Sequence, residues 1–87
     1  MSKMDVSNES GRKLGLWVEP WGADYWLRPG ETLTVVADTA AEQTPFNVVM
    51  HDQGVTVWVN SASAAEVLDK DDKPVPFGHQ RPTSVTS

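Results

Sequence analysis

The chain has 87 residues and no cysteine. Without cysteine the protein has no disulfide framework, no thiolate nucleophile and no cysteine-ligated zinc or iron–sulfur site. Long apolar runs are also missing, since none approaches the roughly 20 residues of a membrane-spanning helix. Residues 1–13 lack the apolar central segment of a secretory signal. We therefore expect a soluble, cytoplasmic protein with no membrane partner.

Basic residues are scarce, with 7 lysines and arginines against 12 acidic residues and a net charge of −5. The imbalance is larger in residues 14–77, where 10 acidic and 3 basic side chains leave a charge of −7. A nucleic-acid-binding surface needs clustered lysine and arginine to replace the counterions of the phosphates. The sequence therefore predicts no nucleic-acid partner.

Motifs of the common catalytic and metal sites are missing too. The chain contains no G-x-S-x-G elbow, no glycine-rich phosphate loop and no HExxH helix. Residues 69–73 are acidic but lack the glycine and glutamate that complete a calcium loop. His51 and Asp52 are adjacent, so their side chains diverge on a strand and do not converge on a metal ion. We expect no enzymatic activity, no metal and no cofactor.

Apolar residues recur with a period of two through the middle of the chain. The alternating segments are 14–19, 25–28 and 32–38. This pattern is typical of strands with one buried face. Residues 1–13 and 78–87 are polar and aperiodic, and we expect both to be disordered arms flanking a single domain of residues 14–77.

Turn residues separate these segments. Arg28-Pro29-Gly30-Glu31 fits a type II turn, because proline presets φ at the second position and glycine supplies the positive φ at the third. We expect a tight reversal between the strands on either side. Pro20 ends the first strand, and Gly22 relaxes the backbone before the next.

Residues 46–60 form the strongest predicted hairpin. With Gln53 and Gly54 as a two-residue loop, Met50 faces Val57 and Val48 faces Val59 on one apolar side. A three-residue loop would mix polar and apolar side chains on both faces, so we favour the shorter loop.

The segment after Asn60 has two interpretations. Ser63 and Glu66 could form a capping box that opens a short helix. We favour a short strand over residues 66–69, a turn at 70–73 and an edge strand at 74–77 that contains two prolines. The sequence thus predicts an all-β fold, a small antiparallel β-sandwich or barrel of six or seven short strands.

The four tryptophans are the most informative side chains. On the alternation, Trp17 and Trp26 lie opposite the Leu/Val face, while Trp58 shares a polar face with asparagine and histidine. Such a tryptophan is either covered by a loop, a chain end or a subunit, or forms an exposed platform for a sugar or a protein partner. The candidate ligand or partner site combines Trp58 with Asn47, His51 and Asn60, and Trp21 and Trp26 form a second candidate cluster.

Two stretches carry a resemblance to known proteins. Glu19-Pro20-Trp21-Gly22 is followed by the Tyr-x-Leu-x-Pro-Gly-Glu pattern of residues 25–31 and by a hairpin ending at residues 57–59. Together they resemble a group of small bacterial all-β proteins of unassigned function. The resemblance covers residues 16–60 and implies no activity. The second pattern also occurs in cupin-like β-sandwich proteins, but the paired histidine motifs of metal-binding cupins are missing here.

These observations predict a non-catalytic β binding module or protein-interaction module. Two alternatives remain open: a structural homo-oligomer or accessory subunit whose tryptophans are buried against another chain, and a carbohydrate-binding domain that presents an aromatic platform to a glycan. An enzyme with a diffuse acidic site ranks last, because no motif selects a pair among the acids.

Overall fold

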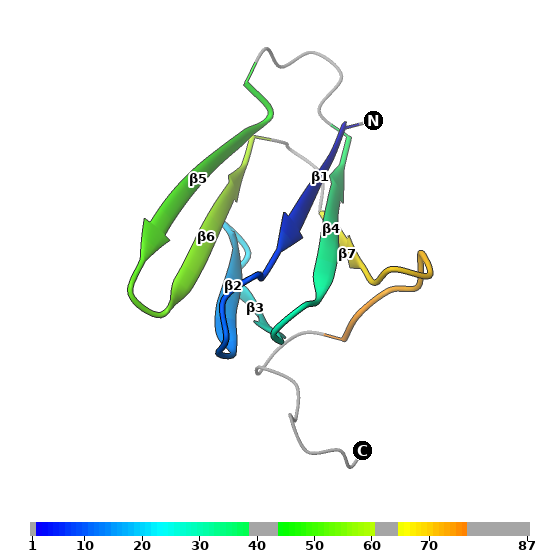
Figure 1. Ribbon diagram of the computed structural model, residues 1–87. Helices are drawn as coiled ribbons and strands as arrows, with labels where there is room; N and C mark the ends of the chain where they lie inside the picture. Colours follow the sequence, from blue (N-terminus) through cyan, green and yellow to red (C-terminus); the bar gives the residue numbers. More distant parts are fainter. Residues whose placement is uncertain (1, 39–43, 61–64, 77–87) are drawn as a thin grey trace.

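The computed structural model describes residues 2–38, 44–60 and 65–76, which form an open β-sandwich (Figure 1). Seven strands lie in these residues. They are β1 (Ser2–Ser7), β2 (Leu14–Glu19), β3 (Ala23–Leu27), β4 (Thr32–Ala37), β5 (Phe46–His51), β6 (Gly54–Val59) and β7 (Glu66–Leu68). The predicted all-β sandwich is confirmed, and the two sheets do not close into a barrel.

The strands divide into a three-stranded sheet, β1-β4-β7, and a four-stranded sheet, β3-β2-β6-β5. Neighbours are antiparallel except β2 and β6, which run parallel. The parallel pair brings two segments far apart in the chain side by side, and the local sequence pattern does not predict it.

The core lies between the sheets and is formed by the alternating apolar side chains. Leu16 and Val57 from the larger sheet and Leu33 and Val35 from the smaller one are fully buried. Burial of each such side chain stabilises the fold by about 1.5–3 kcal/mol. The opposite face of each sheet is turned away from this core, and on the smaller sheet it carries Val36, which is also buried.

The N-terminal segment corrects the sequence interpretation. Residues 2–7 are not a disordered arm but form β1, which pairs with β4 along its full length (Figure 1). Met4 and Val6 pack against the core, while Thr34 Oγ1 donates a hydrogen bond to Asp5 Oδ1 at 2.7 Å. A segment with two apolar residues shows little periodicity by itself, and the exposed edge of β4 supplies the missing stabilisation.

A buried asparagine anchors the turn that follows β1. Asn8 is only 1% exposed. Its Nδ2 donates to the carbonyl oxygens of Arg12 and Leu27, both at 2.8 Å, and its Oδ1 accepts from Ser10 N at 2.9 Å. Residues 9–13 are thereby folded back against the entrance to β2, so the ordered domain begins well before residue 14.

The turn at residues 28–31 is present but connects different partners than expected. Glu31 N donates to Arg28 O at 2.9 Å, and Gly30 has a φ of 79°. These features agree with the predicted type II turn. The flanking strands β3 and β4 lie in different sheets, so the turn carries the chain across the sandwich and does not close a hairpin.

In the β5–β6 hairpin the side chains share faces as predicted, but the cross-strand pairs differ from the predicted ones. Met50 pairs with Val55 and Val48 with Val57, so the loop consists of Asp52 and Gln53 and the predicted register is wrong by two residues. A two-residue shift preserves which side chains share a face, because side chains alternate with a period of two. Gly54 belongs to β6 and not to the loop.

The segment after Asn60 is partly described. Glu66–Leu68 forms the favoured strand, β7, which pairs with β4. Pro74 makes a single bridge to Leu68, and Val75 N donates to Val67 O at 2.9 Å, so the chain returns along the edge as expected. The alternative helix start at Ser63, the end of the edge strand at Phe77 and the expected C-terminal tail lie outside the described residues.

Candidate functional site

The solvent-facing side of the β3-β2-β6-β5 sheet, here called the outer face, carries most of the candidate residues. Its register arranges the side chains in rows that cross the strands. The first row contains Trp26, Gly15, Gly54 and His51, the second Asp24, Trp17, Thr56 and Val49, and the third Glu19, Trp58 and Asn47.

Three indoles cross the outer face on a diagonal, which we call the indole stripe. Trp26 lies on β3, Trp17 one row further on β2, and Trp58 one row further again on β6. Diagonal neighbours on adjacent strands are roughly 7–8 Å apart, so the stripe is about 15 Å long. Trp58 is 46% exposed, and the other two indoles are half-buried. The described chain therefore leaves Trp58 substantially uncovered.

Two glycines shape the surface beside the stripe. Gly15 and Gly54 are paired, so no side chain stands at the centre of the first row. The imidazole of His51 reaches over this gap to Trp17, with ring centroids 5.1 Å apart and planes tilted by 44°. His51 Nε2 and Thr56 Oγ1 are within hydrogen-bond distance at 3.2 Å. His51 is thus fixed against the middle of the stripe.

A hollow of about 240 Å³, which we call the Trp17–Trp26 hollow, lies at one end of the stripe. Its lining residues are Arg12, Lys13, Trp17, Trp26 and Gln53. Lys13 Nζ lies 3.9 Å from the centroid of the Trp26 ring, a cation–π arrangement. Arg12 Nη2 donates to the carbonyl oxygen of Asp52 at 2.8 Å and so links the first turn to the β5–β6 loop.

Amides surround the other end of the stripe. Asn47 is the cross-strand partner of Trp58. Asn60 Nδ2 donates to Asn47 Oδ1 at 2.8 Å and to Thr44 O at 2.6 Å. This bonding fixes the Asn47 side chain and leaves its own amide nitrogen as a hydrogen-bond donor for a ligand.

The structure brings together only part of the predicted site. Trp58, Asn47 and Asn60 form one group as expected, whereas His51 lies at the far end of β5 against Trp17. Trp21 is 40% exposed in the turn between β2 and β3, and Trp26 lines the hollow with Trp17 and not with Trp21. Trp21 does not line this hollow, and the pairing of Trp21 with Trp26 stays a prediction.

The sequence prediction does not include four residues that line the Trp17–Trp26 hollow: Trp17 on the outer face, and Arg12, Lys13 and Gln53 in the adjoining turns. The alternation already placed Trp17 on the same side as Trp26, so that signal was available. Arg12 and Lys13 belong to the polar, aperiodic residues 1–13, and Gln53 belongs to a turn, so no local pattern marks these three residues as part of a site.

Tyr25 is the described titratable group whose pKa is clearly shifted. Tyr25 alternates with Trp26 and faces the core, and burial, assisted by the negative charge of Asp24, raises the pKa of Tyr25 to about 12. Its hydroxyl stays protonated at neutral pH.

Across the described ranges, histidine, aspartate and glutamate side chains do not gather in groups of three that could hold a metal ion. Those ranges also include no helix with the length and apolar character needed to cross a membrane.

Comparison with known proteins adds no relationship. No protein-family model, curated protein or solved structure matched the chain. The resemblance to small bacterial proteins over residues 16–60 therefore stays an expectation, and the interpretation of function depends on the outer face itself.

Proposed function

We propose that the protein is a non-catalytic binding module that holds a saccharide against the indole stripe. The observation that carries this proposal is the diagonal of Trp26, Trp17 and Trp58 on the solvent face of one sheet. Indole rings combine a large apolar face with an N–H donor, and aromatic side chains of this kind dominate recognition surfaces. A sugar ring has an apolar face of C–H groups that packs on such a surface.

The polar groups beside the stripe suit the hydroxyl groups of a sugar. Asn47 flanks Trp58, and Thr56 and His51 lie next to Trp17. These groups supply both donors and acceptors close to an apolar surface. A stripe of about 15 Å exceeds a single ring, so an oligosaccharide is a better match than a monosaccharide.

Titration with a panel of oligosaccharides, followed by two-dimensional NMR and tryptophan fluorescence, tests this proposal. We expect the indole N–H signals of all three stripe tryptophans to shift together. Trp58→Ala and Trp17→Ala should each weaken binding by roughly tenfold, since an aromatic stacking contact contributes on the order of 1 kcal/mol beyond its buried area.

Trp21→Ala is the matched control, because Trp21 is similarly exposed but lies in a turn outside the stripe. The Trp21→Ala variant should bind the oligosaccharide with the same affinity as the unmodified protein. Equal losses in Trp21→Ala and Trp58→Ala, or unshifted stripe signals across the panel, would contradict the proposal.

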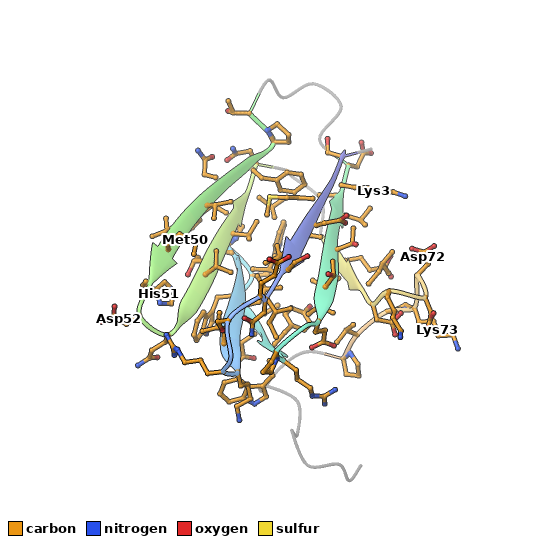
Figure 2. All side chains as sticks on the ribbon, viewed as in Figure 1. Lys3, Met50, His51, Asp52, Asp72 and Lys73 are labelled. Atoms are coloured by element: carbon orange, nitrogen blue, oxygen red, sulfur yellow. The ribbon has the colours of Figure 1, made fainter. Side chains whose placement is uncertain are left out.

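A second candidate function, self-association, is favoured by the free edge of β5. Val48 and Val49 are each 48% exposed and Met50 is 75% exposed. Figure 2 shows Met50 and His51 projecting from β5 near the end of the hairpin, at the outer edge of the four-stranded sheet. An edge strand carries unpaired backbone donors and acceptors, and proteins normally protect such edges with charges or prolines.

The other edges carry that protection, whereas β5 does not. The edge strand β1 has Lys3 and Asp5, and β3 has Asp24, while β7 is followed by Pro74. β5 reads FNVVMH and contains neither a proline nor an acidic, lysine or arginine side chain. For a chain of net charge −5, this neutral edge is where two copies meet with the least repulsion.

Sedimentation at tens of micromolar tests self-association. We expect a dimer that Val49→Lys converts to a monomer, because the new charges face each other across the paired edges. Ser7→Lys, at the edge strand of the other sheet, should leave the dimer intact. A strictly monomeric unmodified protein would exclude this candidate without affecting the saccharide proposal.

A further inference from the structure

The Trp17–Trp26 hollow has the size of one ring. Its volume of about 240 Å³ is below the roughly 300–1,000 Å³ of pockets that enclose a whole drug-sized ligand. Two indoles form its apolar walls, and the stripe continues from it towards Trp58. The hollow is therefore suited to one terminal or branching unit of a ligand whose remainder lies along the stripe.

The polar lining of the hollow is cationic, in contrast to the rest of the domain. Arg12 and Lys13 both line it, although the chain as a whole carries −5. Within the described ranges, the guanidinium of Arg12 contacts a backbone carbonyl and the ammonium of Lys13 contacts an indole ring, and neither meets a carboxylate. Arginine has five N–H donors, so most of those on Arg12 stay available.

The backbone that carries these cations is anchored. The carbonyl oxygen of Arg12 accepts hydrogen bonds from the buried Asn8 Nδ2 at 2.8 Å and from Ser10 Oγ at 3.0 Å. The Arg12 side chain is attached at its other end to Asp52 O. Charges held in place before binding lose little conformational entropy when a ligand arrives.

Positively and negatively charged residues lie at opposite ends of the indole stripe. Arg12 and Lys13 precede β2 and lie beyond the Trp26 end, whereas Glu19 lies in the same row as Trp58 at the other end. Asp24 lies one row from Trp26, on the side away from the two cations. An anionic group is therefore favoured at the Arg12 and Lys13 end and disfavoured at the Trp58 end.

We propose that the ligand is an acidic saccharide whose anionic substituent, a carboxylate or a sulfate ester, binds Arg12 and Lys13 in the Trp17–Trp26 hollow. This inference rests on the proposed saccharide-binding function and adds the chemical class and the orientation of the ligand. The sugar ring that bears the anion packs between the two indoles, and the neutral rings follow the stripe towards Trp58 and Asn47.

Calorimetric titration with three oligosaccharides of the same length tests the inference: one neutral, one containing a uronate and one carrying a sulfate ester. We expect at least one acidic ligand to bind roughly tenfold or more tightly than the neutral one, since a hydrogen bond to a charged group contributes about 1.5–3 kcal/mol. The two acidic arms show which anion the hollow prefers, and preference for either supports the inference.

Lys13→Met and Arg12→Met remove the charges while keeping most of the aliphatic stem. Each should reduce affinity for the acidic ligand by roughly tenfold, and by clearly more than it changes affinity for the neutral ligand. Lys3→Met, on the exposed side of β1, is the control for long-range attraction and should change neither affinity. An equal loss in Lys3→Met would overturn a local anion site.

The outcomes separate the two proposals. If neutral and acidic ligands bind equally and Trp17→Ala weakens both, the stripe binds saccharides and the inference about the anion is wrong. If neither neutral nor acidic ligands bind, the proposed function itself is wrong. Circular dichroism of each variant confirms that a loss of binding does not come from a loss of fold.

Discussion

Gly54 shows how one residue can determine both the pairing of two strands and the form of a surface. Its φ is 149°, and a Cβ at this position would lie less than 3.0 Å from the carbonyl oxygen, nitrogen and carbonyl carbon of Gly15. Backbone atoms cannot yield as a flexible side chain can. The close approach of β2 and β6, and with it the neighbouring positions of Trp17 and Trp58, depends on the missing side chain.

Gly54→Ala should therefore destabilise the protein strongly. We expect the free energy of unfolding to fall by about 3 kcal/mol or more, because unfavourable φ and a backbone clash act together. Urea unfolding followed by tryptophan fluorescence measures this loss. Gly11→Ala is the matched control, since a Cβ there meets nothing within 4 Å, and comparable losses in the two variants would contradict the explanation.

The raised pKa of Tyr25 leads us to expect that the free energy of unfolding falls at alkaline pH. Burial, assisted by Asp24, raises the pKa of Tyr25 from 10.0 to about 12, whereas in the unfolded chain the phenol titrates near about 10. Above pH 10 the unfolded state loses this proton first. The free energy of unfolding should be insensitive to this group below pH 10 and fall by up to about 1.4 kcal/mol per pH unit between pH 10 and 12.

Urea unfolding between pH 9 and 12 measures that slope, and the absorbance of tyrosinate reports Tyr25 alone because the chain has a single tyrosine. Tyr25→Phe subtracts the contribution of every other titrating group. An identical decline in the variant and the unmodified protein would show that Tyr25 is not responsible.

Residue-level features were largely predictable from the sequence, with one kind of error. Alternation assigned Trp17, Trp26 and Trp58 to the face opposite the core, because a period of two is a local property of a strand. The sequence pattern assigns Gly54 to the turn, because a glycine required by a turn and a glycine required by a close strand look the same in sequence. That ambiguity produced the two-residue error in the hairpin register.

At the scale of elements, β1 is the strand whose existence the sequence did not indicate. If residues 2–7 form an ordered strand, an introduced carboxylate should affect stability differently on its two sides, whereas in a disordered arm the position should not matter. Val6→Asp places a carboxylate against the core, where Val6 packs, and should lower the free energy of unfolding by about 2–4 kcal/mol. Ser7→Asp places the same group on the exposed side, where a carboxylate can still accept a hydrogen bond from the Thr32 hydroxyl that now lies 2.7 Å from Ser7 Oγ, and it should change stability by less than about 0.5 kcal/mol.

Thermal unfolding of the two variants, combined with hydrogen exchange of the β1 amides, distinguishes the two descriptions. Equal stability of Val6→Asp and Ser7→Asp would mean that residues 2–7 contribute nothing to the core.

The sequence predicted strands one at a time but not which strands become neighbours. Turn chemistry correctly located the type II turn at Gly30, yet the strands on either side of it lie in different sheets. The β2–β6 pair joins segments with no local signal of mutual affinity, since pairing depends on how the whole sandwich covers its apolar faces. For this reason the sequence indicated separate tryptophans, and their common stripe became visible only in the structure.

At the scale of the whole molecule, the stripe exists only in the folded chain, because its indoles come from three strands. A ligand that binds there stabilises the native state by RT ln(1 + [L]/Kd), about 2.7 kcal/mol at a hundredfold excess over Kd. An acidic saccharide at that concentration should raise the free energy of unfolding by this amount in the unmodified protein. In Trp58→Ala the same concentration should give a smaller gain, and an equal gain would place the ligand elsewhere.

The parallel neighbours β2 and β6 also have a consequence during synthesis. While the ribosome is still adding residue 53, the nascent chain already holds Trp17 and Trp26, but the strand that carries Trp58 and covers the other edge of β2 has not yet been made. A truncated product that ends before β6 lacks Trp58 and so lacks the complete indole stripe, however well its first hairpin forms. Under the saccharide proposal, binding therefore requires a chain that extends through β6.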